Sequence, residues 1–233
     1  MTDSTIYPVF DSIKERTHLT KEQYQEMYAR SLEDSDQFWS EQATQNIDWF
    51  EPFNKVSDYD FHSAEIKWFE GGKLNVSYNC IDRHLDNRAD QVAIIWEGDD
   101  PDQSQHITYQ TLHDEVCRLA NAMKEQGIAK GDRVCLYMPM VPQAVYAMLA
   151  CTRIGAIHSV VFGGFSPEAL RGRINDSECK MVITADEGLR GAKPIPLKAN
   201  VDEACKETPS IESVLVCRVT GNEVGWQEGR DVW

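Results

Sequence analysis

Short apolar runs alternate with helical patterns over the C-terminal two thirds of the chain. Between the runs, apolar residues spaced three and four apart predict helices, as at Leu112, Val116 and Met123 ahead of Gly127. Strand and helix alternating four times predict an α/β fold with a largely parallel sheet flanked by helices. The predicted strands are 92–97, 133–138, 157–162, 180–184 and 214–219, and short apolar runs such as 157–162 fit strands covered on both faces.

Local signals mark where several helices begin. Thr20 is followed three residues later by Gln23, which predicts a capping box and a helix with Tyr24, Met27, Tyr28 and Leu32 on one face. A second short helix is expected at about 36–43. Further along, Thr108 and the Ser166-Pro167 pair are typical helix starts, and residues 142–154 and 197–206 have helical patterns.

The first part of the chain has a different character. Residues 1–70 contain 13 of the 22 aromatic residues, and 46–72 shows no regular period. We expect residues 1–75 to form a mostly helical or irregular extension that packs on the following domain. Residues 76–233 then form the first part of a larger domain. The chain stops at Trp233 without a closing helix, which favours truncation over an ordinary terminus.

Charge and cysteine content exclude several classes of protein. Lys and Arg number 23 against 38 Asp and Glu, a formal charge of −15, which disfavours nucleic acids and anionic membranes as partners. No apolar run approaches the roughly 20 residues that span a bilayer. Seven cysteines, an odd number without a Cys-x-x-Cys pair, suggest reduced thiols and a cytoplasmic location rather than a disulfide framework or a metal site.

Several catalytic and nucleotide-binding motifs are missing. The chain has no G-x-G-x-x-G, so a dehydrogenase-like sheet loses its main support, and it has no G-x-x-x-x-G-K-[ST] loop. The G-x-S-x-G and H-E-x-x-H motifs are also missing, and the six histidines are dispersed. His158, within an apolar run, fits a core histidine better than a catalytic base. We therefore predict no metal site.

One loop combines glycines with a helix start. Phe162-Gly163-Gly164-Phe165 lies between a predicted strand and the helix capped by Ser166. In a parallel sheet this loop lies at the carboxyl end of its strand, where ligands of open α/β sheets bind. Glycines permit close approach of a ligand, and a helix N-terminus attracts anions. The alternative is a tight turn that needs glycine only for its geometry.

A second loop concentrates positive charge in this acidic chain. Arg190-Gly191-Ala192-Lys193, followed by Lys198, comes after the predicted strand 180–184 and so belongs near the same edge of the sheet. Arginine and lysine there are suited to binding a phosphate. The alternative is a solvated loop. The two loops together predict an anion site at the carboxyl ends of the strands.

The amino-acid sequence of several segments resembles that of the acetyl-coenzyme A synthetases, a branch of the adenylate-forming acyl-CoA synthetase superfamily. The strings IWEGDD, YMPMVP and VFGGFSPEA are the most specific, and the aromatic region at Tyr24, Phe38 and Trp39 is similar to the extension of these enzymes. The matching segments are Leu74–Asp86, Ala93–Asp100, Tyr137–Leu170, Val182–Gly188, Ile195–Lys198 and Trp226–Trp233.

The resemblance implies a ligase that uses ATP, Mg²⁺ and coenzyme A. Acetate would form acetyl-adenylate and diphosphate, and CoA would then displace AMP. It also implies that Phe162, Gly163 and Gly164 contact CoA, and that Arg190, Gly191, Ala192 and Lys193 meet its phosphates. Lys193 departs from the arginine common in the family, and lysine lacks bidentate geometry.

The resemblance places the catalytic residues and the acyl pocket after Trp233. The chain alone is therefore expected to be inactive and to pair with the rest of its own chain. A propionyl-CoA synthetase, or a free-standing, non-catalytic CoA- or nucleotide-binding module, remains the alternative.

Overall fold

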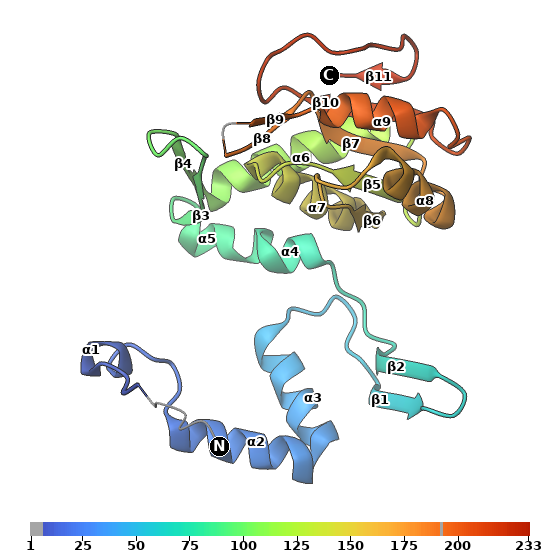
Figure 1. Cartoon of the computed structure of the whole chain (residues 1–233). Coiled ribbons are helices and arrows are strands. Elements are labelled where there is room, and N and C mark those ends of the chain that lie inside the picture. Colours follow the sequence, from blue (N-terminus) through green and yellow to red (C-terminus); the bar gives the residue numbers. More distant parts are fainter. Residues whose placement is uncertain (1–6, 192) are drawn as a thin grey trace, which may run out of the picture. The chain divides into compact units, whose positions relative to one another are not determined.

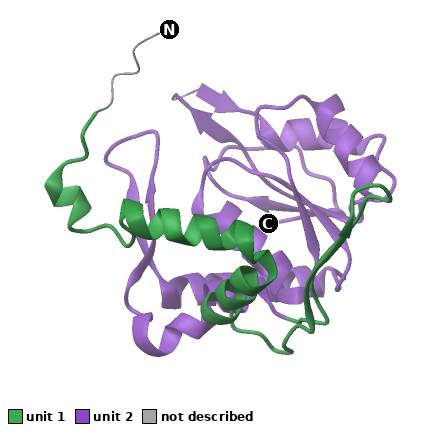
Figure 2. Ribbon diagram, turned by 90° about the horizontal axis from the view of Figure 1, so that it is seen from below, with its two compact units in different colours: residues 1–73 green, residues 74–233 purple. Residues whose placement is uncertain are grey.

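The computed structural model describes residues 7–191 and 193–233, which form two compact units (Figures 1 and 2). The first unit ends at Lys73 and the second begins at Leu74. Each unit is described by itself below. No helix in the described part of the chain combines the length and apolar character needed to cross a membrane.

Over residues 7–73, the first unit contains three helices and a hairpin. The capping box of α2 is confirmed: the Thr20 hydroxyl accepts a hydrogen bond from the Gln23 amide at 3.2 Å, and the Gln23 side chain accepts one from the Thr20 amide at 2.8 Å. The second predicted helix is also present as α3, longer at both ends. The elements are α1 (Asp11–Lys14), α2 (Lys21–Glu33), α3 (Ser35–Asn46), β1 (Lys55–Asp60) and β2 (Glu65–Glu70).

The prediction of irregular structure over 46–72 is wrong in part, because β1 and β2 pair as an antiparallel hairpin. Its strands are mostly exposed, so they lack the apolar alternation that would mark them in the sequence. Trp49, Phe53 and Phe69 pack on one another, with ring centres 5.1–5.6 Å apart. The aromatic residues thus build a local cluster, and packing of this unit on the following domain stays a prediction.

The second unit is built on a five-stranded sheet in the order β11-β10-β7-β5-β6 (Figure 1). Every pairing in it is parallel, which confirms the predicted fold class. The central strands β5 and β7 are buried along nearly their whole length. The strands are β5 (Arg133–Tyr137), β6 (Ile157–Val160), β7 (Met181–Ala185), β10 (Ser213–Cys217) and β11 (Asp231–Val232).

Helices cover both faces of this sheet. The chain moves from β5 to β6 through α7 and then back across β5 to β7 through α8. Because such crossovers are right-handed, the reversal places α7 and α8 on opposite faces. Helix α6 packs on α7, and α9 packs on α8. The helices are α6 (Tyr109–Glu125), α7 (Pro142–Ile154), α8 (Pro167–Ser177) and α9 (Leu197–Cys205).

Two sequence predictions about strands need correction. The predicted strand at 92–97 exists as β3 (Val92–Glu97), but it pairs antiparallel with β4 (Ser104–Thr108) outside the main sheet. The run at 157–162 is not covered on both faces, because β6 is the last strand in the sheet order and Ile157 and Val160 are more than half exposed. An apolar run reveals a strand but not its partner.

The core of the second unit surrounds β5 and β7. Val116 and Met123 of α6, Leu170 of α8 and Val201 of α9 are fully buried. The helix starts at Thr108 and Ser166 are confirmed, since both hydroxyls accept a backbone hydrogen bond from the first turn. Shorter elements complete the unit: α4 (Val76–Cys80), η1 (Asp82–His84), α5 (Leu85–Arg88), β8 (Gly188–Arg190) and β9 (Lys193–Ile195).

Candidate functional site

The glycine loop, Phe162-Gly163-Gly164-Phe165, joins β6 to α8 at the carboxyl end of the sheet. The Tyr137 hydroxyl, from the end of β5, donates toward the carbonyl oxygens of Gly163 at 3.1 Å and Phe165 at 2.8 Å. Burial raises the pKa of Tyr137, although a hydrogen bond from Asn200 opposes this. The phenol therefore keeps its proton and holds the loop in place.

The loop requires glycine for close approach. A Cβ on Gly163 would lie 3.3 Å from the carbonyl oxygen of Met138, and one on Gly164 would lie 2.6 Å from the Phe162 ring. These contacts support the turn-geometry interpretation. They also place the loop beside the end of β5, where the chain reverses its direction across the sheet. Ligands of open α/β sheets bind at such a reversal point, so the steric role and a binding role are compatible.

The basic loop is the tip of a hairpin that the sequence did not predict. Strands β8 and β9 pair antiparallel, with Arg190 opposite Lys193. Gly191 has a φ of +55°, a left-handed conformation that favours glycine at the turn. The side chains of Arg190 and Lys193 are exposed. Ala192 lies outside the described residues.

The structure brings the two loops together. The Arg190 guanidinium carbon lies 5.8 Å from the centre of the Phe162 ring, within the range of a cation–π contact. Both loops also pack on the start of α9: a Cβ at Gly163 or at Gly188 would lie within 3.4 Å of a Leu197 methyl group. The side-by-side placement expected from the topology is therefore observed.

A further arginine belongs to this surface and was missed from the sequence. The Arg173 guanidinium of α8 lies 4.7 Å from the centre of the Phe165 ring, and Phe165 contacts Phe162 edge to face. Position 173 is about two turns beyond the predicted helix start at Ser166, so only the helix geometry could have shown it near the loop. The rings of Phe162 and Phe165 in the glycine loop thus lie between two exposed cations, Arg190 and Arg173.

Lys198 does not belong to this cationic surface, which corrects the sequence prediction. Its ammonium group is fully buried and contacts Asp202 at 2.6 Å, Asp231 at 2.8 Å and the Gly225 carbonyl at 2.9 Å. Burial would raise the pKa of Asp231, but hydrogen bonds from Arg230 and Lys198 outweigh it and lower the pKa. Lys198 therefore joins α9 to β11 and has no charge to offer a ligand.

Asp186 shapes the neighbouring loop after β10. Its buried carboxylate accepts hydrogen bonds from the backbone amides of Glu187, Val219, Thr220 and Gly221 at 2.7–3.2 Å. Burial acts to raise its pKa, yet the four amides together lower it. Sequence reasoning missed this residue, because a carboxylate following a strand gives no sign of which amides will surround it.

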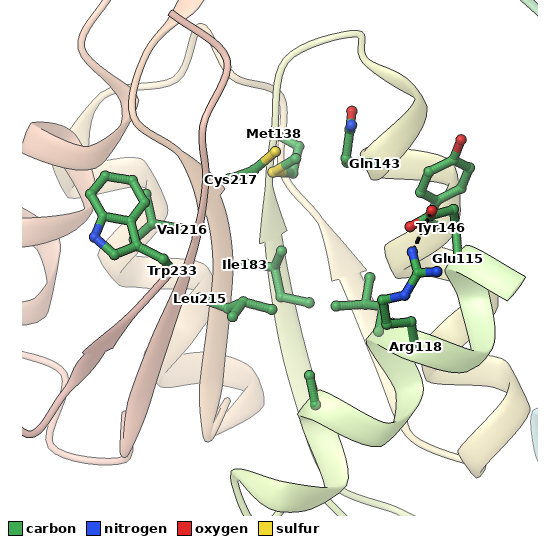
Figure 3. A pocket seen from close by; sticks show the side chains of 12 residues that line it. Glu115, Arg118, Met138, Gln143, Tyr146, Ile183, Leu215, Val216, Cys217 and Trp233 are labelled. Atoms are coloured by element: carbon green, nitrogen blue, oxygen red, sulfur yellow. Dashed lines mark hydrogen bonds and ion pairs between the residues drawn. The ribbon is translucent and has the colours of Figure 1, made fainter. Parts of the chain in front are cut away.

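An apolar cavity of about 260 Å³ lies apart from these loops, between α6 and the face of the sheet (Figure 3). Ile183, Leu215 and Trp233 line it, and the Glu115–Arg118 ion pair lies at its side. Such a lining offers no phosphate-binding group comparable with Arg190 and Lys193. His158, on β6, is half-buried, and burial lowers its pKa, as expected for a neutral structural histidine.

Two family models match the chain. Residues 24–80 match the model described as "Acetyl-coenzyme A synthetase N-terminus", and residues 81–231 match "AMP-binding enzyme". The chain belongs to the AMP-binding enzyme family. The glycine loop, the hairpin and the whole parallel sheet lie within the second match, apart from the final residue of β11.

Two similar relatives are named acetyl-coenzyme A synthetase. An acetyl-coenzyme A synthetase of Alkalilimnicola ehrlichii is 58% identical over the whole chain, and one of Vibrio cholerae is 59% identical. The chain spans 36% of the length of these relatives. A solved structure of acetoacetyl-CoA synthetase from Streptomyces lividans has the same fold, with a TM-score of 0.81 over 94% of the chain and 34% of that protein at 23% identity.

Proposed function

We propose that the chain is the N-terminal part of an acetate–CoA ligase and carries part of its CoA-binding surface. The parent enzyme would convert acetate and ATP to acetyl-adenylate and diphosphate, and CoA would then displace AMP to give acetyl-CoA. The supporting observations are the match to the N-terminal family model and relatives of that name at 58–59% identity along the whole chain. Seven free cysteines are compatible with a cytoplasmic location.

The observation that carries the CoA assignment is the meeting of the glycine loop and the cationic hairpin. Arg190 and Lys193 are exposed and lie opposite one another at the hairpin tip. Arginine binds phosphate through a planar fork, and lysine acts as a point charge. Coenzyme A presents phosphate groups of this kind. On a chain of charge −15, two exposed cations that lie next to each other make this surface a favoured place for an anion.

The aromatic rings of the loop add positioning. The Phe162 side chain is 59% exposed, and the Arg190 guanidinium lies over its ring in a cation–π contact. A guanidinium already held against a ring loses less conformational freedom when it binds, which strengthens binding. Gly163 and Gly164 let the loop pack closely against Met138 and the Phe162 ring, which fixes the position of these rings. The contacts of Phe162, Gly163, Gly164, Arg190, Gly191, Ala192 and Lys193 with CoA remain part of the proposal.

The rest of the chemistry is assigned to parts of the parent that this chain does not span. We assign no ligand of ATP, Mg²⁺ or acetate to the present residues, and we expect the chain alone to release no diphosphate from ATP. The apolar cavity at Ile183, Leu215 and Trp233 is suited to packing against further residues of the parent. In this proposal the rest of the chain is thus the partner of this unit.

The test is to separate the two half-reactions in the full-length parent. Arg190→Ala should raise the KM for CoA roughly tenfold, since it removes a charge-assisted phosphate contact. Acetate-dependent exchange between ATP and diphosphate should stay within about twofold of wild type. Equal loss in both half-reactions would contradict the assignment. Acetate-dependent diphosphate release by the purified 233-residue chain would contradict its being an incomplete ligase.

A further inference from the structure

A cysteine, a histidine and a carboxylate of α6, namely Cys117, His113 and Asp114, are linked by side-chain contacts. The Cys117 sulfur lies 3.5 Å from Nε2 of His113, one helical turn earlier. Nδ1 of the same ring lies 3.0 Å from the Asp114 carboxylate. A thiol, an imidazole and a carboxylate in this order form the arrangement that activates cysteine nucleophiles.

The hydrogen bonds define what each nitrogen of the ring does. Asp114 accepts from Nδ1–H, which leaves Nε2 of the neutral ring as an acceptor facing the thiol. A second carboxylate oxygen, from Asp82, lies 3.6 Å from Nε2. Asp82 is itself held by Arg153 through two contacts of 2.5 and 3.1 Å. Once Nε2 takes the thiol proton, two carboxylates therefore stabilise the imidazolium.

Cys117 opens onto a cavity of about 440 Å³. Asn121 and two basic residues, Lys124 and Arg153, also line it. Lys124 is exposed and forms no ion pair within residues 7–191 and 193–233. Arg153 is already paired with Asp82, so Lys124 is the cation of this lining that is left to attract a small anionic reagent to the thiol.

The other thiols lack this combination. Burial raises the pKa of five of them, to about 12 for Cys151 and about 11 for Cys217; the five are Cys135, Cys151, Cys179, Cys205 and Cys217. Cys80 is exposed, and it has no hydrogen-bond partner within the described part of the chain. Thiolate formation needs both access and a neighbouring base or positive charge. Cys117 has both.

We propose that Cys117 is a site of thiol–disulfide exchange with small disulfides that carry carboxylates. His113 Nε2 takes the thiol proton, and the Cys117 thiolate attacks one sulfur of the disulfide. A new S–S bond forms as the old one breaks, and the departing thiolate takes the proton from the imidazolium. The protein thiol ends as a mixed disulfide, while half of the reagent is reduced to a thiol.

The experiment compares two cysteines in the same molecule. The purified protein is treated briefly with oxidised glutathione, an anionic disulfide, or with cystamine, a cationic one, and each cysteine is followed by peptide mass mapping. With oxidised glutathione, Cys117 should be modified about fivefold faster than the more exposed Cys80. With cystamine the preference for Cys117 should be smaller, because the His113 base still favours this thiol but the charge of Lys124 does not attract a cationic reagent.

Two variants separate activation from mere access. His113→Gln should slow the Cys117 reaction with both reagents about fivefold, because the base is lost. Lys124→Gln, at an exposed position, should slow only the reaction with oxidised glutathione. Modification of Cys80 is the internal control in both variants. The proposal is wrong if Cys80 reacts as fast as Cys117 in the wild type, or if both variants leave the Cys117 rates unchanged.

Discussion

Two groups of basic residues, the hairpin pair Arg190 and Lys193 and the single residue Lys198 five positions later, have opposite environments. Arg190 and Lys193 stand exposed at the tip of a hairpin, with Arg190 lying against an aromatic ring. Lys198, in the next helix, is fully buried between Asp202 and Asp231. The residue types are alike, but their surroundings differ. Arg190 and Lys193 are available to bind a ligand, whereas Lys198 stabilises the fold.

The difference teaches that a positive charge is available only where the fold has left it without a close counter-ion. The hairpin offers Arg190 a ring, which supports the guanidinium without neutralising it. Helix α9 and strand β11 offer Lys198 two carboxylates and a carbonyl, which neutralise it. The comparison therefore predicts that substitutions in the two groups will have separable effects, on stability for one and on binding for the other.

The largest effect is expected at the buried group. Lys198→Met should lower the free energy of unfolding by about 3 kcal/mol, because it removes one of the two cations, Lys198 and Arg230, that neutralise Asp202 and Asp231. Urea denaturation of the purified protein measures this. Arg190→Ala is the matched control and should change stability by no more than about 0.5 kcal/mol, as is usual at exposed positions. Similar losses of unfolding free energy in the two variants would contradict the difference proposed between Lys198 and the hairpin residues.

A smaller effect is expected at Asp186, which sharpens the comparison because backbone amides rather than side chains surround its charge. Asp186→Asn replaces the oxygen that accepts from Gly221 with an amide nitrogen, so two donors face each other. The expected loss of stability is about 2 kcal/mol. Asp176→Asn, at an exposed position, is the control. A loss at Asp186 no larger than at Asp176 would contradict the role given to the carboxylate.

The same carboxylate predicts a pH dependence. Its pKa in the folded protein is lowered below the ordinary 3.8, so it stabilises the fold fully at neutral pH. That contribution is lost as the pH falls through about 4 and below, since the unfolded state then binds the proton more readily. Between pH 7 and pH 3, the free energy of unfolding measured from denaturation curves should fall less for Asp186→Asn than for wild type. Parallel curves would be the contrary result.

The smallest effect tests geometry at constant charge. Arg190→Lys keeps the positive charge of the hairpin but removes the planar fork and its stacking on Phe162. We expect the KM of the full-length parent for CoA to rise about threefold, less than for Arg190→Ala. A KM equal to that of Arg190→Ala would show that the positive charge alone contributes nothing to CoA binding. A KM equal to that of wild type would show that the planar guanidinium contributes nothing beyond its charge.

Much of the fold could be predicted because its signals are local. The capping box at Thr20, the helix starts at Thr108 and Ser166, and the parallel strand pattern were all confirmed. What failed depends on partners distant in sequence. The partner of strand 92–97, the exposed edge at β6 and the exposed hairpin at 55–70 follow from tertiary pairing, which periodicity does not record.

The candidate site was predictable to the same extent. Strand order placed the glycine loop and the basic loop at one edge, and their contact through Phe162 and Arg190 agrees with that expectation. Lys198 was misassigned because a sequence does not show that Asp231 lies beside it. Arg173 was overlooked because its place above Phe165 depends on how α8 leaves the loop.

The most direct test of the central claim, that the two loops form one CoA-binding surface, is a double-mutant cycle. The KM for CoA of the full-length parent is measured for Phe162→Ala, Arg190→Ala and the double variant, with exchange between ATP and diphosphate as the control. If the ring positions the guanidinium, the double variant should lose clearly less than the product of the two single losses. Losses that simply multiply, or no change in any variant, would contradict a shared surface.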